Sequence, residues 1–231
     1  MGNAYKLLFE TQPEAFEMET LLEQKGTSDE KQMFLSGVFG ACGRLNQNGR
    51  VYQRGEMKNE ITRYGKEMID TGKSGGELNH PTEIFINPER ICDRTVSLRL
   101  DESSGLVYGK ALIADTPCGR IQRGLIDSGF RIGKSSRSLG AMADQLFEGK
   151  QAKVVQGMKV IAWDSVTEPS ESLAMVDPLL ESREYIMGDD GGFMQKPFED
   201  LDGTLARLPR HGKEQYIVEA FDNFLKTIKF G

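Results

Sequence analysis

Residues 94–113 read RTVSLRLDESSGLVYGKALI, which is two strand-like segments separated by a turn. In the first segment the apolar residues Val96, Leu98 and Leu100 alternate with polar ones, a pattern typical of a β-strand with one buried face. The second segment runs Leu-Val-Tyr-Gly-Lys-Ala-Leu-Ile, and residues 101–105 between the two have turn composition. The stretch therefore predicts a β-hairpin.

On either side of this hairpin the pattern continues as a mixture of strands and a few helices. Residues 33–39 are apolar enough for a buried strand, and residues 130–139 and 154–163 are further strand candidates. Residues 54–71 and 119–128 have apolar side chains at helical spacing, and each segment is followed by a glycine that can end a helix. The strict alternation of strand and helix in a Rossmann sheet is missing, so we expect an α+β or barrel-like domain.

The character of the chain changes after Pro178. Residues 181–213 are polar and rich in glycine and proline, which predicts a linker. Residues 214–231 recover a helical stripe of apolar side chains and predict a C-terminal helix. We therefore expect a compact domain over residues 1–180, followed by the linker and the helical tail.

The bulk composition excludes several classes of function. A formal net charge of −6 argues against a general nucleic-acid binder and against binding to an anionic membrane. No apolar run is long enough for a membrane span or a signal peptide. The three cysteines are widely spaced and form no CxxC pair, so neither a disulfide framework nor a zinc ribbon is expected. These features predict a soluble, cytoplasmic protein.

The residues best suited to chemistry are spread along the chain. His80 lies between a glycine-rich turn and Pro81, which disfavours helical backbone at His80. Ser135 and Ser136 lie in a predicted strand, and Asp164 is expected at the end of another. Together they offer a nucleophile, a base and an acid that orients the base. The alternative is that these residues have structural roles only: a loop histidine, serines that cap local amides, and an aspartate that begins a turn.

Neighbouring residues could support this chemistry. Arg137 is our candidate for stabilising a developing oxyanion, directly or through water, and the alternative is a surface arginine paired with a carboxylate. Glu77 and Asn79 could orient His80, although Glu77 could equally be solvated.

Four ordered segments resemble one known family. They are GELNHP at 76–81, NGRVY at 48–52, SSRSLG at 135–140 and DSVTEPS at 164–170. Together they resemble the prohead core (capsid-maturation) serine proteases of T-even-type tailed bacteriophages. The resemblance extends over roughly residues 35–177.

This resemblance implies a serine endopeptidase with a fold similar to the herpesvirus assemblins, a β-barrel-like core surrounded by helices. It implies His80 as general base, Ser135 as nucleophile with Ser136 as the rival, and Asp164 as the orienting acid in place of a second histidine. Ser138 stands where the family usually has glycine, which would cost strain if that position required a positive φ.

The resemblance also implies a substrate preference. The family usually cuts after glutamate, and this chain has such sites at Glu148, Glu181 and Glu219, so we expect self-cleavage. The implied substrates are phage scaffold or core proteins and the major capsid protein, cut inside the assembling prohead in the host cytoplasm. We expect a homo-oligomer, with no cofactor, metal, nucleic acid or membrane partner.

Two other readings stay open. The chain could be an inactive structural member of the prohead core with the same fold. It could also be a metal-dependent hydrolase that uses His80, Glu77 and His211, but without an HExxH motif or a cysteine cluster the ligand count is poor.

Overall fold

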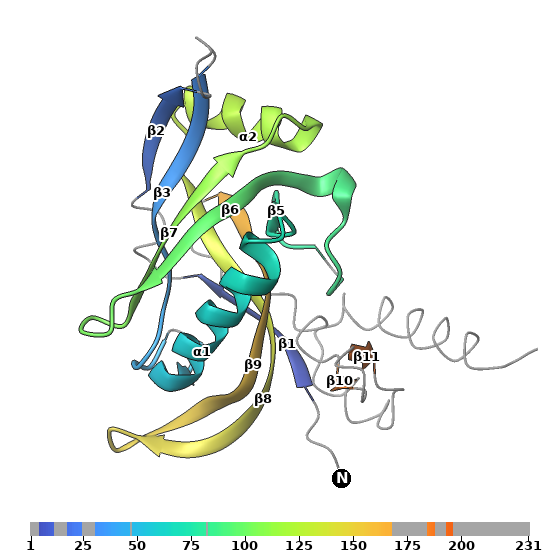
Figure 1. Ribbon diagram of the computed structural model, residues 1–231. Coiled ribbons are helices and arrows are strands. Elements are labelled where there is room, and N and C mark those ends of the chain that lie inside the picture. Colours follow the sequence, from blue (N-terminus) through green and yellow to red (C-terminus); the bar gives the residue numbers. More distant parts are fainter. Residues whose placement is uncertain are drawn as a thin grey trace, which may run out of the picture. The chain divides into compact units, whose positions relative to one another are not determined.

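The computed structural model describes residues 5–11, 18–24, 31–46, 48–81, 83–167, 184–187 and 193–195 (Figure 1). The chain divides into two compact units. The larger unit is Leu8–Glu171, and it holds His80, Ser135 and Asp164. The description below concerns this unit unless stated otherwise.

The smaller unit comprises residues 1–7 and 172–231. Within it, β10 (Glu184–Met187) pairs antiparallel with Tyr5 and Lys6 and also with β11 (Phe193–Gln195).

The first sheet, to which β1 contributes Leu8–Thr11 of the larger unit, has the strand order β1–β8–β9–β4. These strands are β1 (Tyr5–Thr11), β8 (Ile132–Phe147), β9 (Lys150–Thr167) and β4 (Arg50–Tyr52). β8 and β9 form one long antiparallel hairpin, whereas β4 lies parallel to β9. The long hairpin carries two of the three predicted catalytic residues.

The second sheet has the strand order β2–β3–β7–β6–β5, and all its pairs are antiparallel. Its strands are β2 (Glu19–Gln24), β3 (Lys31–Ala41), β7 (Leu106–Ile113), β6 (Ile91–Leu100) and β5 (Gly75–Glu77). After β5, Leu78 forms a parallel bridge with Ser165 of β9. This bridge joins the two sheets beside His80.

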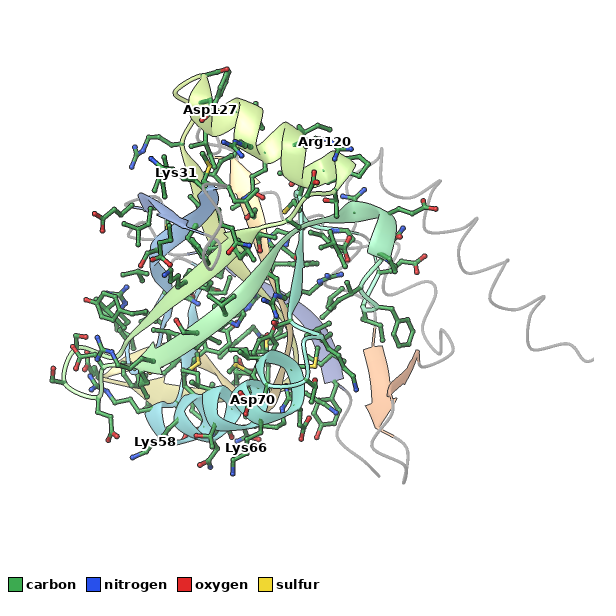
Figure 2. All side chains as sticks on the ribbon, turned by 45° about the horizontal axis from the view of Figure 1, so that its top comes forward. Lys31, Lys58, Lys66, Asp70, Arg120 and Asp127 are labelled. Atoms are coloured by element: carbon green, nitrogen blue, oxygen red, sulfur yellow. The ribbon has the colours of Figure 1, made fainter. Side chains whose placement is uncertain are left out.

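Few helices accompany the sheets. α1 (Arg54–Tyr64) continues into a π-helical segment, η2 (Gly65–Ile69). It buries Met57 and Tyr64, while the charged side chains labelled in Figure 2, such as Lys58 and Lys66, project outward into solvent. None of the described helices is long and apolar enough to cross a membrane.

α2 (Pro117–Asp127) covers part of the second sheet and begins at a well-formed cap. The Oγ1 atom of Thr116 accepts a hydrogen bond from the amide of Gly119 at 3.0 Å, and Pro117 occupies the first turn. A short 3₁₀ helix, η3 (Pro88–Arg90), precedes β6.

One hydrophobic core joins both sheets and α1. The rings of Phe39 on β3 and Trp163 on β9 lie 5.8 Å apart in a tilted arrangement, and Met57 and Tyr64 of α1 belong to the same cluster. Gly109 on β7 leaves room for Phe39, since a Cβ there would lie 2.7 Å from the ring. Trp163 therefore anchors the strand that carries Asp164.

The predicted hairpin is confirmed as β6–β7, with Gly105 at a φ of +75° in its turn. The strand predicted at 33–39 lies within β3, and the helices predicted at 54–71 and 119–128 are present as α1 and α2. The helix expected over 54–71 changes to π geometry at Gly65 and ends at Ile69.

The placement of Asp164 at a strand end is wrong. β8 and β9 extend over 16 and 18 residues, well beyond the predicted 130–139 and 154–163, and β9 continues to Thr167. Residues 162–166 are all buried. When both faces of a strand are buried, the alternation that marks its length in the sequence is lost.

The α+β class is confirmed. Over the described residues the strands form two open sheets with two α-helices, so the β-barrel core surrounded by helices is not confirmed. β10 and β11 fall within the predicted linker, 181–213. The rest of that segment and the tail 214–231, with Glu181, His211 and Glu219, lie outside the described residues, and the domain boundaries stay predictions.

Candidate active site

The β8–β9 register places Ser135 directly opposite Asp164. Residues directly opposite each other on antiparallel strands have side chains on the same face, with Cβ atoms about 5 Å apart. Both residues are fully buried. A nucleophile candidate and a carboxylate are thus brought side by side by strand pairing alone.

His80 reaches this pair from the loop that follows β5. The amide of Asn79 donates to the carbonyl of Ser165 at 2.8 Å, which ties the loop to β9. Asn79 has a positive φ of 64°, and its Oδ1 accepts from the amide of His80 at 3.0 Å. His80 lies in irregular backbone before the buried Pro81, as the sequence predicts.

The imidazole of His80 bridges the two strand residues. Its Nδ1 lies 3.0 Å from Oδ2 of Asp164, and its Nε2 lies 2.6 Å from Oγ of Ser135. A neutral imidazole protonated on Nδ1 donates to the carboxylate and accepts from the serine hydroxyl, which is the arrangement needed for a general base. One face of the imidazole is covered by Phe9, whose ring centroid is 4.4 Å away.

Ser136 lies on the other face of β8. Successive side chains of a strand point to opposite sides, so Ser136 points away from Ser135, and its partner across the hairpin is Trp163. Ser138 lies on the same side as Ser136 and is not among the described residues with a positive φ, so no φ strain arises from the missing glycine.

Arg137 is fully buried and lies beside Asp164 rather than at the surface. Its Nε lies 3.1 Å and its Nη2 3.3 Å from the two carboxylate oxygens of Asp164. Nη2 also donates to Glu77 at 2.9 Å, and Nη1 donates to the carbonyl of Glu83 at 2.7 Å and contacts that of Phe85 at 3.5 Å. The four N–H groups of Nη1 and Nη2 are thus engaged in hydrogen bonds, whereas Nε is buried beside Asp164 without a hydrogen bond of its own.

Glu77 is a second buried carboxylate behind Asp164. It accepts from Arg137, from Nε of Arg90 at 3.0 Å and from the amide of Asn87 at 3.0 Å. Its own amide donates to Oδ1 of Asp164 at 3.1 Å. Glu77 therefore contacts Asp164 and not His80, and the solvated alternative is wrong because the side chain is fully buried.

Sequence reasoning missed a polar network on the opposite face of the hairpin. Lys134 and Asp93, both fully buried, form an ion pair at 2.5 Å. The same Asp93 oxygen accepts from Oγ of Ser165 at 2.5 Å and from Nε2 of Gln122 at 3.2 Å. The signal available in the sequence was that Lys134 and Ser165 each adjoin a predicted catalytic residue.

Burial shapes the titration of nearby groups. Burial first, and then the negative charges of Asp164 and Asp93, raise the pKa of Tyr64 above its ordinary value. Burial, followed by the charge of Asp93, likewise raises the pKa of the Cys92 thiol. Both groups therefore stay neutral near pH 7, and neither offers an anionic nucleophile.

The described residues contain no group of three His, Cys, Asp or Glu side chains suited to a metal ion. His211, the third member of the metal-hydrolase reading, lies outside them. Glu148 is described and lies in the turn between β8 and β9, with a φ of 50°.

The chain is similar to known proteins over most of its length. Residues 10–184 match the family described as prohead core protein serine protease. The prohead core protein protease of Enterobacteria phage T4 is 29% identical over 149 residues, which cover 63% of this chain and 68% of that protein.

A solved structure, that of the bacteriophage T4 capsid assembly protease, has a similar fold. It aligns with a TM-score of 0.63 and 24% identity, covering 71% of this chain and 99% of its own. The expected resemblance is confirmed, since the family match extends over well more than half of the sequence. This chain belongs to the prohead core protein serine protease family.

Proposed function

We propose that this chain is a Ser-His-Asp endopeptidase that matures phage proheads by cutting scaffold and capsid proteins after glutamate. The observation that carries the proposal is the position of His80, with Nε2 2.6 Å from Oγ of Ser135 and Nδ1 3.0 Å from Asp164. An inactive structural member of the prohead core is the alternative, and the intact hydrogen-bonded chain favours the enzyme.

In this mechanism Ser135 attacks the scissile carbonyl carbon while His80 accepts the hydroxyl proton on Nε2. The resulting imidazolium is stabilised by Asp164 and passes the proton to the leaving amine as the C–N bond breaks. Water then attacks the acyl-enzyme, with His80 again accepting and returning a proton, which releases the new carboxyl end and restores Ser135.

The oxyanion needs donors of its own. Arg137 is the candidate from the sequence, but the N–H groups of its Nη1 and Nη2 are already engaged by carboxylates and carbonyls, and its Nε faces Asp164. A direct contact with the oxyanion would break one of these buried interactions. Arg137 receives a different role below.

Ser135 has no exposed surface in this structure, whereas the side chain of His80 is 19% exposed. A peptide must displace the groups that cover Ser135 before its carbonyl reaches Oγ. Phe9, whose ring lies tilted against that of His80, is one side chain next to this site. Binding of an extended substrate is then coupled to a local rearrangement.

The substrates follow from the family. Relatives are named as a prohead core protein protease and a capsid assembly protease, which supports scaffold or core proteins and the major capsid protein as targets of this chain. We place the reaction inside the assembling prohead in the host cytoplasm, and we propose a homo-oligomeric enzyme with an assemblin-like core.

Glutamate specificity is tested with matched peptides. For a peptide with an aliphatic residue two positions before Glu and a small residue after it, we expect Glu→Gln to lower kcat/KM by about 100-fold or more, because a site that pairs with a carboxylate loses that partner. Mass spectrometry of the products locates the cut. Equal cleavage of both peptides would contradict glutamate specificity, and the Ser135→Ala protein controls for contaminating proteases.

Self-cleavage is tested by the intact mass of the full chain. We expect purified wild type to shorten on incubation while Ser135→Ala keeps its full length of 231 residues. A cut after Glu181 would separate the predicted domain 1–180 from its linker and tail, and a cut after Glu219 would remove only the end of the tail. Glu148 lies in a tight turn and should be cut most slowly, because a protease binds extended backbone.

Variants with Glu→Gln at each of the three positions assign the cuts. Identical C-termini in wild type and Ser135→Ala would overturn self-cleavage without affecting the cleavage of other proteins.

A further inference from the structure

We propose that Arg137 and Glu77 form a buried charge-balancing pair that orients Asp164 and sets the net charge experienced by His80. This inference rests on the proposed function, because it assigns Asp164 to the acid position. It makes Arg137 and Glu77 positioning residues, which act on the reaction only through Asp164 and His80.

The contacts from His80 to Glu77 are continuous. Arg137 lies within 3.1 and 3.3 Å of the two oxygens of Asp164, and the Asp164 oxygen nearer to Nε also faces Nδ1 of His80 at 3.0 Å. On its other side the guanidinium donates to Glu77 at 2.9 Å. Imidazole, carboxylate, guanidinium and carboxylate thus follow one another without a gap.

Burial strengthens the interaction between these charges. The side chains of Arg137, Asp164 and Glu77 are fully buried, so water does not screen their charges from one another. Arg137 alone would cancel the charge of Asp164 and leave none to stabilise an imidazolium. Glu77 restores a net negative charge to the three residues, and this charge favours the protonated state of His80 that catalysis passes through.

Among the described residues, the other charged groups near these three change the balance little. Arg90 donates to Glu77 and is 42% exposed, so its charge is partly screened. On the far face of the hairpin, Asp93 and Lys134 cancel each other as a pair. Tyr64 of α1 is neutral near pH 7, and β1 contributes the apolar ring of Phe9. Glu83 contacts Arg137 through its backbone carbonyl and not through its carboxylate.

Arg137 also fixes the loop that carries His80. Its bonds to the carbonyls of Glu83 and Phe85, together with the bond from the amide of Asn87 to Glu77, fasten the segment just after His80 to β8 and β5. The pair therefore holds the base and the acid in one frame, while the exposed ring of Phe85 stays in solvent.

The proposal predicts shifts of opposite sign in the pH at which His80 titrates. Glu77→Gln changes the net charge of Arg137, Asp164 and Glu77 from negative to zero, so we expect the titration midpoint to fall. Arg137→Met leaves two carboxylates unbalanced and should raise the midpoint by a similar amount. Arg90→Gln removes a half-exposed cation and should raise it less.

The measurement is an NMR pH titration of imidazole resonances in the full chain carrying Ser135→Ala, which prevents self-cleavage. The chain has only two histidines, and His211→Gln assigns the signals. Glu102→Gln is the matched control, since Glu102 forms an exposed ion pair with Lys58 and removes the same charge without an expected shift. Thermal unfolding verifies that each variant is folded.

Shifts of opposite sign for Glu77→Gln and the arginine variants support the proposal. Shifts of the same sign, or none beyond the control, overturn it and reduce both residues to structural supports. If Arg137→Met does not fold, Glu77→Gln and Arg90→Gln still show whether the titration midpoint shifts in opposite directions. The readout needs no activity, so a failure of the proposed protease function would be seen separately, in the peptide assay.

Discussion

Replacing Ser135 by alanine is expected to lower kcat/KM by about 10⁴-fold or more, which is the range for loss of the nucleophile of a serine protease. Its Oγ is the group that lies 2.6 Å from Nε2 of His80. Ser136→Ala is the matched control, because Ser136 is the next residue on the same strand but faces Trp163 on the opposite side. We expect it to keep activity within about tenfold of wild type.

The assay is cleavage of the glutamate peptide, with thermal unfolding measured for each variant. Ser136 is buried, so a moderate loss of stability is compatible with retained activity. An inactive Ser136→Ala together with an active Ser135→Ala would assign the nucleophile to Ser136. No cleavage of the peptide by the wild-type protein would favour the inactive structural role for this fold.

Replacing Lys134 by methionine is expected to lower the free energy of unfolding by about 3–5 kcal/mol. Lys134 and Asp93 are both fully buried and lie 2.5 Å apart, so the substitution leaves a carboxylate without its cation in the interior. Ser165 and Gln122 still donate to that carboxylate, but they carry no compensating charge. Removing one partner of a buried ion pair therefore lowers the free energy of unfolding by more than the intact pair adds to it.

Urea unfolding of the Ser135→Ala protein measures this effect without self-cleavage. The double variant Lys134→Met with Asp93→Asn should recover part of the loss, because the unpaired charge is gone. The control is Lys153→Met, which breaks an exposed pair with Asp144 on the same hairpin and should cost at most about 0.5 kcal/mol. A similar cost for Lys134→Met and Lys153→Met would contradict the role given to the buried pair.

The two faces of the β8–β9 hairpin thus have different roles. One face holds Ser135, Asp164 and Arg137, where polar side chains are arranged around His80. The other holds Lys134 and Ser165 in the network that joins β8 and β9 to β6 and α2. Because the side chains alternate, one strand pair supports the reaction on one side and its own placement on the other.

Much of the fold could be predicted from local patterns. The hairpin β6–β7, the strand β3 and both α-helices follow from apolar periodicity and from turn residues such as Gly105. The full length of β8 and β9 could not, because residues buried on both faces carry no alternation. That is why Asp164 was expected at a strand end although it lies within β9.

The sequence by itself determined the candidate residues, since His80 is one of two histidines and its surrounding motif resembles the family. Only the tertiary structure decided which of them meet. The contacts of His80 with Ser135 and Asp164 join residues 55 and 84 positions apart. Such contacts depend on strand register, and a shift of one residue would turn Ser135 away and bring Ser136 to the imidazole. The same register buries Arg137 beside Asp164 and Lys134 on the opposite face, where composition alone would have placed two cations in solvent.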